Sequence, residues 1–480
     1  MLAFGVVCVT RGARAQLAPA PAHSGPPALT HLPAEQDWRY FSRTERRGAA
    51  LNRMKYMPLG AGDDAYLSLG GEVRPWYHVF RNEVWGAAPT DRDGFLLQRY
   101  SLHADVHASR RVRAFVELKS GLEDGRAGGP RPVDEDRFDL NQAFLELSSA
   151  SRRDVHAAGT AAAGPPTAHV RVGRQELDAG SGRMVSVREG PNVRIGWDGV
   201  RATTHADGWR VDAWGVRPLN TRPGVWDDAR PAGGAFWAVY ASRPIWGGPA
   251  TTGDLYYMGT AKRDAQYDGG RGLGRERRHT LGVRAARAAT PHATVDYDLE
   301  GAVQWGRFAT DAIRAWTIAA SAGYSWHAVR LAPRLGVNVG AGSGDRAPGD
   351  RRENLFVAPA ARGAYFGQST PLGPGNLVGV SPNLTLALAP GLSLRGEWYA
   401  FWRQSARDGI YDVGGQPLRT GQSSRSRFVA AQSHAEAAWQ IDRHLAVGVA
   451  YAYVHAGGFL RDTPPARHIT YVSPRVTLRF

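Results

Sequence analysis

Hydrophobic and polar residues alternate with a period of two along most of this chain. Between residues 293 and 306, the sequence ATVDYDLEGAVQWG places Val295 and Trp305 on one side of an extended segment and Asp296 on the other. Residues 100–108 and 392–403 repeat this alternation. Successive side chains of a strand point to opposite faces, so the pattern predicts β-strands with one apolar and one charged face.

The connections between these segments alternate between short and long. Residues 206–208 and 390–391 are tight turns, 342–376 and 404–428 are long, and 149–168 is long where a short turn is expected. Strands of about 10 residues with short turns at one end and long loops at the other are typical of outer-membrane β-barrels. We therefore predict an all-β fold, a monomeric transmembrane antiparallel β-barrel of about 18 strands. The predicted strands start near residues 66, 95, 112, 139, 169, 199, 209, 234, 252, 278, 293, 313, 328, 377, 392, 429, 445 and 468.

The aromatic residues support a membrane barrel. The sequence ITYVSPRVTLRF ends in Phe480, in register with Leu478 and Val476, and such an amphipathic strand with a terminal aromatic residue is typical of barrels delivered to the outer-membrane assembly machinery. Tryptophans lie near the ends of predicted strands, as in the aromatic girdles at membrane interfaces. The tryptophans assigned to these girdles are Trp76, Trp209, Trp237, Trp305, Trp326, Trp398 and Trp439.

The first residues predict export from the cytoplasm. An apolar run from Leu2 to Val9 precedes Ala13-Arg14-Ala15, an A-x-A cleavage pattern, which predicts a signal peptide over 1–15. Residues 16–36, rich in alanine and proline, are expected to be a disordered lead-in, and 37–480 the barrel. The predicted location is the outer membrane of a Gram-negative bacterium, with outer-membrane lipid as a partner.

The charge of the chain points to an anionic partner. The formal net charge is +15, and all but three of the 59 basic residues are arginine. A bias toward GC-rich codons accounts for much of that preference. However, each guanidinium group is permanently charged and presents a planar fork that suits carboxylate or phosphate. Nucleic acid is not the expected partner, because the alternation leaves no soluble basic face to bind it.

The sequence RVGRQELDAGSGRMVSVREGPNVRIGWDGVR (171–201) concentrates arginine in a stretch that glycine and proline make too broken for a helix. Charged rings in pores select ions of opposite sign, so these arginines are candidates for an anion-selective pore. The alternative is that they form inter-strand ion pairs that stiffen the wall. The candidates are Arg171, Arg174, Arg183, Arg188, Arg194 and Arg201 with Glu176, Glu189 and Asp198, joined by alternation with Arg74, Arg99, Arg113, Lys119, Arg284, Arg334, Arg395 and Arg403 and with Glu72, Glu117, Glu300 and Glu397.

Catalytic and metal-binding motifs give little support for other functions. No G-x-S-x-G or H-E-x-x-H spacing occurs, so we predict a protein that is not an enzyme and has no cofactor. The glycine-rich sequence GAGSGDRAPGD (340–350) resembles a calcium or phosphate loop in which Asp345 and Asp350 would be the ligands. A solvated turn in an extracellular loop is the favoured interpretation of this sequence.

Three stretches and the barrel ending resemble the alginate export family. They are residues 37–86, residues 171–201 and GAGSGDRAPGDRRENLFVAPAARGAYFG (340–367), and the resemblance extends over about 37–480. It implies an eighteen-stranded outer-membrane barrel that passes the polyuronate alginate through an arginine-lined pore, with Arg171 and Arg174 matching the family's G-R-Q/E core.

The expected function is therefore a channel for an anionic, alginate-like polysaccharide, with periplasmic export components as implied partners. Two alternatives have the same fold. One is an anion-preferring diffusion porin for small solutes, and the other is an enzyme or adhesin that uses the barrel as an anchor.

Overall fold

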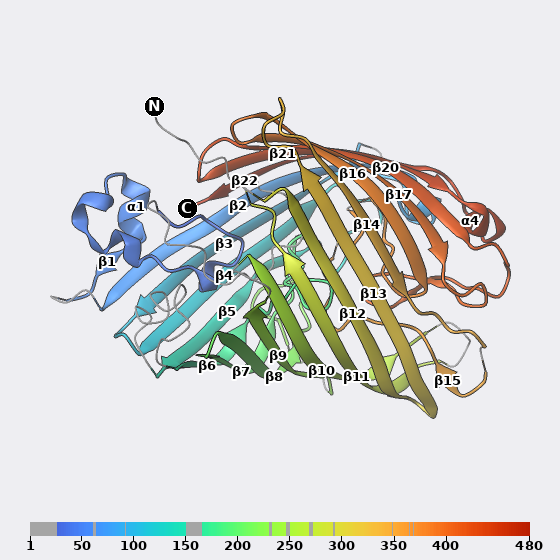
Figure 1. Ribbon diagram of the computed structural model, residues 1–480, viewed down its shortest axis with the longest axis horizontal. Coiled ribbons are helices and arrows are strands. Elements are labelled where there is room, and N and C mark those ends of the chain that lie inside the picture. The colour runs from blue at the N-terminus through green and yellow to red at the C-terminus, as the bar shows by residue number, and fades with distance from the viewer. Residues whose placement is uncertain are drawn as a thin grey trace.

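Eighteen long antiparallel strands close into a barrel (Figure 1). The first of them, β2 (Tyr66–Arg81), pairs on one side with β3 (Phe95–His107) and on the other with the last strand, β22 (Ile469–Arg479), which closes the barrel. The predicted all-β fold and the number of strands are confirmed. The computed structural model describes residues 26–60, 64–91, 93–149, 166–229, 233–245, 250–267, 272–290, 293–347, 349–363, 365–367 and 369–480.

Each predicted strand start lies within six residues of an observed one. The two short strands β1 (Met57–Pro58) and β15 (Arg352–Glu353) join the barrel sheet, and β18 (Ile410–Tyr411) pairs separately with β19 (Pro417–Arg419). The other barrel strands are β4 (Val112–Asp124), β5 (Asp136–Ser148), β6 (Thr167–Gln175), β7 (Trp197–Ala206), β8 (Trp209–Pro218), β9 (Ala235–Pro244), β10 (Thr251–Ala265), β11 (Gly274–Arg287), β12 (Val295–Phe308), β13 (Asp311–Ser325), β14 (Arg334–Gly342), β16 (Leu377–Ala389), β17 (Leu392–Arg403), β20 (Phe428–Gln440) and β21 (Leu445–Ala456).

The helices are few and short. None in the described part of the chain is long and apolar enough to cross a bilayer. They are the 3-10 turns η1 (Pro33–Glu35), η2 (Arg39–Ser42) and η3 (Thr44–Arg46), and the helices α1 (Ala50–Met54), α2 (Glu83–Gly86) and α4 (Gly458–Asp462).

Alternating side chains of the strands point outward and into the lumen, as the period of two predicts. On β5, Leu145 is 60% exposed on the outer surface, whereas its neighbour Glu146 is 3% exposed. On β3, Leu102 is likewise exposed and His103 buried. The outer wall is therefore apolar where lipid would contact it, and the charged residues lie inside the barrel.

Most of the tryptophans assigned to girdles lie on the outer surface. Trp305, Trp326, Trp398 and Trp439 are exposed, and Trp209 and Trp237 are half-buried. The assignment of Trp76 is wrong, because Trp76 has the lumen-facing parity of Arg74 on β2. Its indole N–H donates a hydrogen bond to the Ser473 hydroxyl, and the guanidinium carbons of Arg74 and Arg475 lie 5.0 Å and 4.8 Å from its ring centre.

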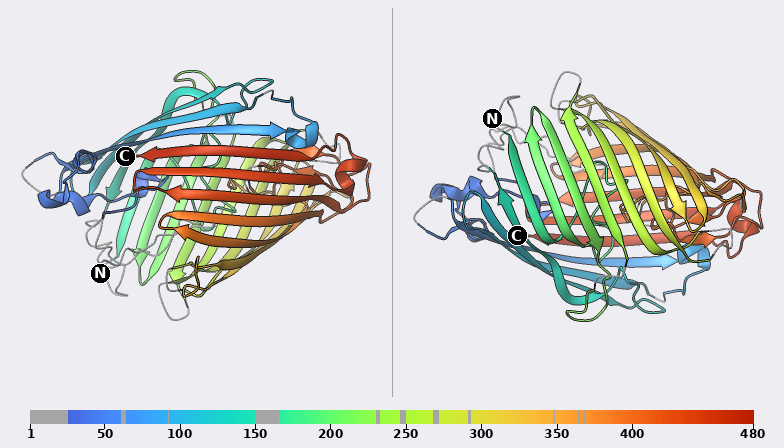
Figure 2. Two further views of the ribbon diagram at one scale, coloured as in Figure 1. Left: turned by 90° about the horizontal axis from the view of Figure 1, so that it is seen from above. Right: turned by 90° about the horizontal axis from the view of Figure 1, so that it is seen from below.

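The two ends of the barrel differ in their connections. Short turns such as 207–208 and 390–391 lie at the end that carries α1 and Phe480, and long connections lie at the end that carries α4 (Figures 1 and 2). Since short turns face the periplasm in outer-membrane barrels, we call these the periplasmic and extracellular ends. The predicted signal peptide lies outside the described residues. Of the expected disordered lead-in, residues 16–25 also lie outside the described residues, whereas 26–36 are ordered at the periplasmic end, where Ala34 packs against wall residues.

Two long connections enter the lumen and supply much of the hydrophobic core. We call residues 176–196, between β6 and β7, the first inward segment, and residues 343–376, between β14 and β16, the second. Buried residues of the first, including Val185, pack with Phe356 of the second against lumen-facing residues of β7–β10 such as Trp214. The core of the protein therefore lies inside the barrel.

Candidate transport pathway

The two inward segments join across the lumen through main-chain hydrogen bonds. Ser186 N donates to Ala360 O at 2.8 Å, Ala360 N donates to Met184 O at 2.9 Å, and Arg362 N donates to Gly182 O at 3.1 Å. These bonds form a short parallel bridge between Val185 and Ala360. The main chains of the two segments therefore narrow the lumen, and each segment helps to hold the other in place.

Glycine permits the sharp course of the first inward segment. Gly180 and Gly182 have φ values of +58° and +74°, in the left-handed region that glycine adopts without steric cost. At Gly180 a Cβ atom would also collide with the Tyr240 hydroxyl of β9. The close approach of this segment to the wall thus depends on a residue without a side chain.

Glu189 ties the first inward segment to the barrel through four arginines. Its carboxylate lies 2.6 Å from Arg99 Nη2 and 2.6 Å from Arg194 Nη2, 3.4 Å from Arg479 Nη2 and 3.7 Å from Arg74 Nη1. Burial raises the pKa of Glu189, but the charges of Arg194, Arg99 and Arg74 outweigh burial and hold that pKa well below its usual range. Because Arg74, Arg99 and Arg479 belong to β2, β3 and β22, this carboxylate fixes the segment beside the seam where the barrel closes.

A second group of ion pairs holds the middle of the same segment. Arg183 Nη1 lies 2.9 Å from Asp298 and 3.3 Å from Glu300, both on β12. Arg284 of β11 bridges Asp298 at 2.9 Å and Asp254 of β10 at 2.7 Å. The first inward segment is therefore fixed to both sides of the barrel by charge-assisted hydrogen bonds.

The other predicted candidates also lie in ion pairs. Every candidate arginine except Arg188 and Arg403 has a carboxylate oxygen within 4.0 Å, as has Lys119, which is the arrangement expected if the arginines stiffen the wall. Whether they also select ions stays a prediction. The remaining pairs are Arg171–Glu146 at 2.8 Å, Arg174–Asp198 at 3.1 Å, Arg194–Glu176 at 3.4 Å, Arg201–Asp212 at 2.8 Å, Arg113–Asp105 at 2.6 Å, Arg99–Glu72 at 2.6 Å, Arg334–Asp296 at 2.5 Å and Arg395–Glu397 at 3.1 Å. Glu117 accepts hydrogen bonds from Asn141 and Gln142.

Arg403 has a structural environment. Its side chain is fully buried and donates to the main-chain oxygens of Asp408, Ser424 and Ser426, and its guanidinium lies 4.0 Å from the centre of the Phe459 ring. It therefore anchors the extracellular connection 404–427.

Arg188 and Arg362 are two guanidinium groups without an acidic partner at the junction of the inward segments. Arg188 Nε donates to Ala361 O at 3.1 Å, and Arg362 Nη2 donates to Tyr365 O at 3.3 Å. Within the described residues, neither has a carboxylate oxygen within 4.0 Å. Burial lowers the pKa of both, and the charge of Arg183 lowers that of Arg362 further. Arg188 also has φ +56°, a conformation that costs a non-glycine residue about 1–3 kcal/mol and is most often kept at functional sites.

A cavity of about 410 Å³ lies between the two inward segments and the wall from β11 to β22. Its lining is rich in arginine and includes four arginine candidates from the sequence, while the other five arginines of 171–201 stand outside it. Arg475 follows the alternation of its strand and could have been found that way, whereas Arg362 lies in an aperiodic connection that gives no such signal. The arginines of the lining are Arg183, Arg284, Arg287, Arg334, Arg362, Arg395, Arg475 and Arg479, and the acidic residues are Asp296, Asp298, Glu397 and Glu436.

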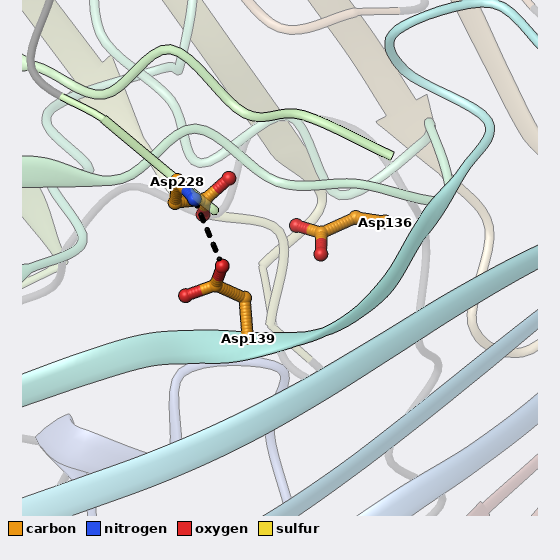
Figure 3. A group of neighbouring side chains, drawn as sticks. All are labelled: Asp136, Asp139 and Asp228. Carbon is orange, nitrogen blue, oxygen red and sulfur yellow. Dashed lines mark hydrogen bonds between the residues drawn. The ribbon is translucent and has the colours of Figure 1, made fainter. Parts of the chain in front are cut away.

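The two predicted cation ligands, Asp345 and Asp350, have different environments. Asp350 is exposed and accepts from Arg352 N, whereas Asp345 is buried and accepts from Asn354. Among the described residues, the acidic side chains close enough to share a metal ion are instead Asp136, Asp139 and Asp228 (Figure 3).

A lysine already occupies a cation position at this acidic cluster. Lys119 Nζ lies 2.6 Å from Asp136 and 2.9 Å from Asp228, and Asp228 N donates to Asp139 at 3.0 Å. The cluster joins β4 and β5 to the connection 219–234, so we interpret it as a structural ion pair.

Raising the pH from about 5 to about 8 should loosen the first inward segment. Burial raises the pKa of Asp178 to about 7 and that of Glu176 to about 7. A carboxyl group with a raised pKa in the folded form stabilises that form below its unfolded pKa, and this contribution is lost as the pH rises through the folded pKa. Single-channel recordings should therefore show more frequent conductance steps at the higher pH. In the Asp178→Asn variant the frequency of conductance steps should depend less on pH. An unchanged pH dependence would mean that other groups cause it.

The chain matches one family model and several solved structures. The model of the alginate export family matches residues 65–472. No match was found among curated protein sequences. The crystal structure of Pseudomonas aeruginosa OccD3 (OpdP) is 11% identical with a TM-score of 0.57, covering 95% of this chain and 99% of that one. OccK11 (OpdR) of P. aeruginosa is 14% identical with a TM-score of 0.52, covering 88% and 98%.

A third structure contains a ligand. It is that of P. aeruginosa OccK2 (OpdF) in complex with glucuronate, which is 11% identical with a TM-score of 0.56, covering 86% of this chain and 98% of that one. At these identities the likeness shows the fold alone.

Proposed function

The chain belongs to the alginate export family, and on that premise we propose that this outer-membrane channel passes an anionic polysaccharide built of uronate units. The membrane is the outer membrane of a Gram-negative bacterium, and periplasmic export components deliver the polymer. The substrate moves through a pore whose positive potential comes from arginine.

The observation that carries this proposal is the pair Arg188 and Arg362. An unpaired guanidinium group in a narrow, partly desolvated passage attracts anions and repels cations far more strongly than one neutralised by a carboxylate. Both groups stand where the two inward segments meet. A uronate carboxylate passing the junction would find free donors in planar, bidentate geometry.

The paired arginines of the cavity support the same passage. Arg334 and Arg395 each share their charge with a neighbouring acid, so an anion held there competes with Asp296 or Glu397 and leaves readily. Conduction needs such weak, repeated sites, because an anion bound too tightly would block the channel. The glucuronate complex of OccK2 supports a uronate as the chemical class, since it records that ligand in a barrel of the same fold.

A second candidate is an anion-preferring diffusion porin for small solutes. The cavity of about 410 Å³ favours it, because that volume accommodates a small acid more easily than a folded length of polymer. Both candidates use the same arginines, and they differ in whether a chain of sugars can enter.

Single-channel recording of the purified protein in planar bilayers separates the two. We expect anion selectivity, and block of the current by trigalacturonate but not by the neutral trisaccharide maltotriose. Each carboxylate held by a free guanidinium contributes about 1.5–3 kcal/mol, or roughly tenfold or more in affinity. Anion selectivity without block would support the porin, and a channel without anion preference would contradict both.

A further inference from the structure

The segment that precedes the barrel strands enters the periplasmic mouth. Ala34 is buried against the rings of Phe115 on β4 and Phe144 on β5. Arg113 Nη2 donates a hydrogen bond to Ala34 O at 2.9 Å. Ala34 therefore lies against the inner wall at β4 and β5, on the lumen side.

This position places the carboxylate of Glu35 between two arginines. Glu35 Oε1 lies 3.0 Å from Arg171 Nη1 of β6 and 3.4 Å from Arg201 Nη1 of β7. Burial raises the pKa of Glu35, but the charges of Arg171, Arg201 and Arg210 outweigh it and lower the pKa to about 2. The Glu35 side chain is 36% exposed, so water and solutes reach the carboxylate.

The wall around Glu35 is short of one negative charge without it. Around Glu35 the strands provide four guanidinium groups, those of Arg113, Arg171, Arg201 and Arg210, but only three carboxylates. Glu35 supplies the fourth carboxylate. It is also the one acid of the four that does not belong to the barrel wall. The pairs of the wall are Arg113–Asp105, Arg171–Glu146, Arg201–Asp212 and Arg210–Asp212.

We propose that Arg171 and Arg201 form a carboxylate-binding site for an incoming uronate at the periplasmic mouth, which Glu35 of the chain itself occupies until the substrate displaces it. This inference rests on the proposed function for the identity of the substrate. The ligand class follows from the occupant, because a side-chain carboxylate and a uronate carboxylate offer the same two oxygens to the guanidinium groups.

The structure permits Glu35 to leave while the rest of the N-terminal region stays bound. Residues after Glu35 have their own attachments, since β1 pairs with β2 and Lys55 Nζ donates to the main-chain oxygen of Phe480 at 2.8 Å. Trp38 and Tyr56 pack in a separate buried cluster with Phe41. Besides the Glu35 ion pairs and the Ala34 packing, displacement of residues 26–36 breaks the hydrogen bond from Arg443 to Pro27 O and the packing of Leu29 on that cluster.

The first test compares Glu35→Gln with Glu45→Gln in planar bilayers. Glu45 is exposed in the same region and lies in no ion pair with the described residues, so its variant matches the change in net charge. Glu35→Gln should raise the anion-to-cation permeability ratio in potassium chloride and tighten block by trigalacturonate added to the periplasmic side about tenfold. If both variants have the permeability ratio and the block of the parent, Glu35 has only a structural role and the inference is overturned. This conclusion does not depend on whether trigalacturonate blocks the parent, which is the test of the proposed function.

The second test uses the parent protein and does not depend on a variant folding. At a trigalacturonate concentration that blocks the current, amide hydrogen exchange in residues 26–36 should become faster, whereas maltotriose should leave it unchanged. Unchanged exchange during full block would overturn displacement. A selectivity change in Glu35→Gln with no trigalacturonate block in any variant would instead overturn the uronate substrate while retaining the anion site.

Discussion

Replacing both Arg188 and Arg362 by glutamine should remove most of the channel's preference for anions. Neither guanidinium is neutralised by a carboxylate of the described chain, so each contributes its full charge to the potential at the junction. At an effective dielectric of about 20, one charge 4 Å from an ion is worth roughly 4 kcal/mol before desolvation reduces it. A residual of about 1.4 kcal/mol per site is a factor of ten, so the double variant should lose at least tenfold in permeability ratio.

The reversal potential in a salt gradient measures this ratio. Arg407→Gln combined with Arg425→Gln is the matched control, because both arginines are exposed in the extracellular connection 404–427, outside both inward segments, and the net charge changes equally. The control should stay near the parent value, and high salt should shrink the difference because the Debye length is only about 3 Å at 1 M. An unchanged ratio in the Arg188 and Arg362 variant, with the barrel folded, would place selectivity elsewhere in the lumen.

The strand positions could be predicted from the sequence because their cause is local. A barrel wall imposes a period of two on every strand, so the apolar neighbours of Arg284 and Arg334 alone predict that these arginines face the lumen. Trp76 shows that this alternation is a better guide to the position of a side chain than its residue type. Its aromatic ring suggests the membrane interface, but its parity with Arg74 places it inside, where two guanidinium groups lie within 5.0 Å of the ring centre.

The junction could not be predicted because it depends on contacts between distant segments. Arg362 lies in a connection with no periodicity, and its position results from main-chain bonds to residues about 180 positions earlier in the chain, such as Gly182. Glu35 was missed for a related reason. Alanine and proline around it indicated disorder, yet the position is ordered by Phe115, Phe144 and two arginines of the wall.

Ion pairing separates the arginines of 171–201 into different roles. Arg171, Arg174, Arg194 and Arg201 are held by carboxylates, so substitution of any of them leaves an acid unpaired in the wall. Among the described residues Arg188 has no such partner, so its replacement leaves no carboxylate there unpaired. A change in selectivity at Arg188 would therefore report on the pore itself, whereas a change at Arg201 would mix selectivity with stability.

Replacing Glu189 by glutamine should release the first inward segment. The carboxylates of Glu72, Glu176 and Glu189 serve Arg74, Arg99, Arg194 and Arg479, so the variant leaves two carboxylates for four guanidinium groups. Glutamine has the same shape, and the effect is therefore one of charge. Removing one partner of a buried ion pair typically costs about 3–5 kcal/mol, because the remaining charges stay desolvated without compensation.

Hydrogen exchange and conductance should report this release together. A loss of 3 kcal/mol in local stability corresponds to roughly a hundredfold faster exchange of amides in 176–196, while the strands of the barrel stay protected. The same displacement should widen the passage and raise the single-channel conductance. Glu436→Gln is the control for exchange, since Glu436 pairs only with Arg475 among the described residues, at 3.5 Å. Equal exchange in both variants would mean that the hydrophobic packing of Val185 and Phe356, rather than Glu189, holds the segment inside the barrel.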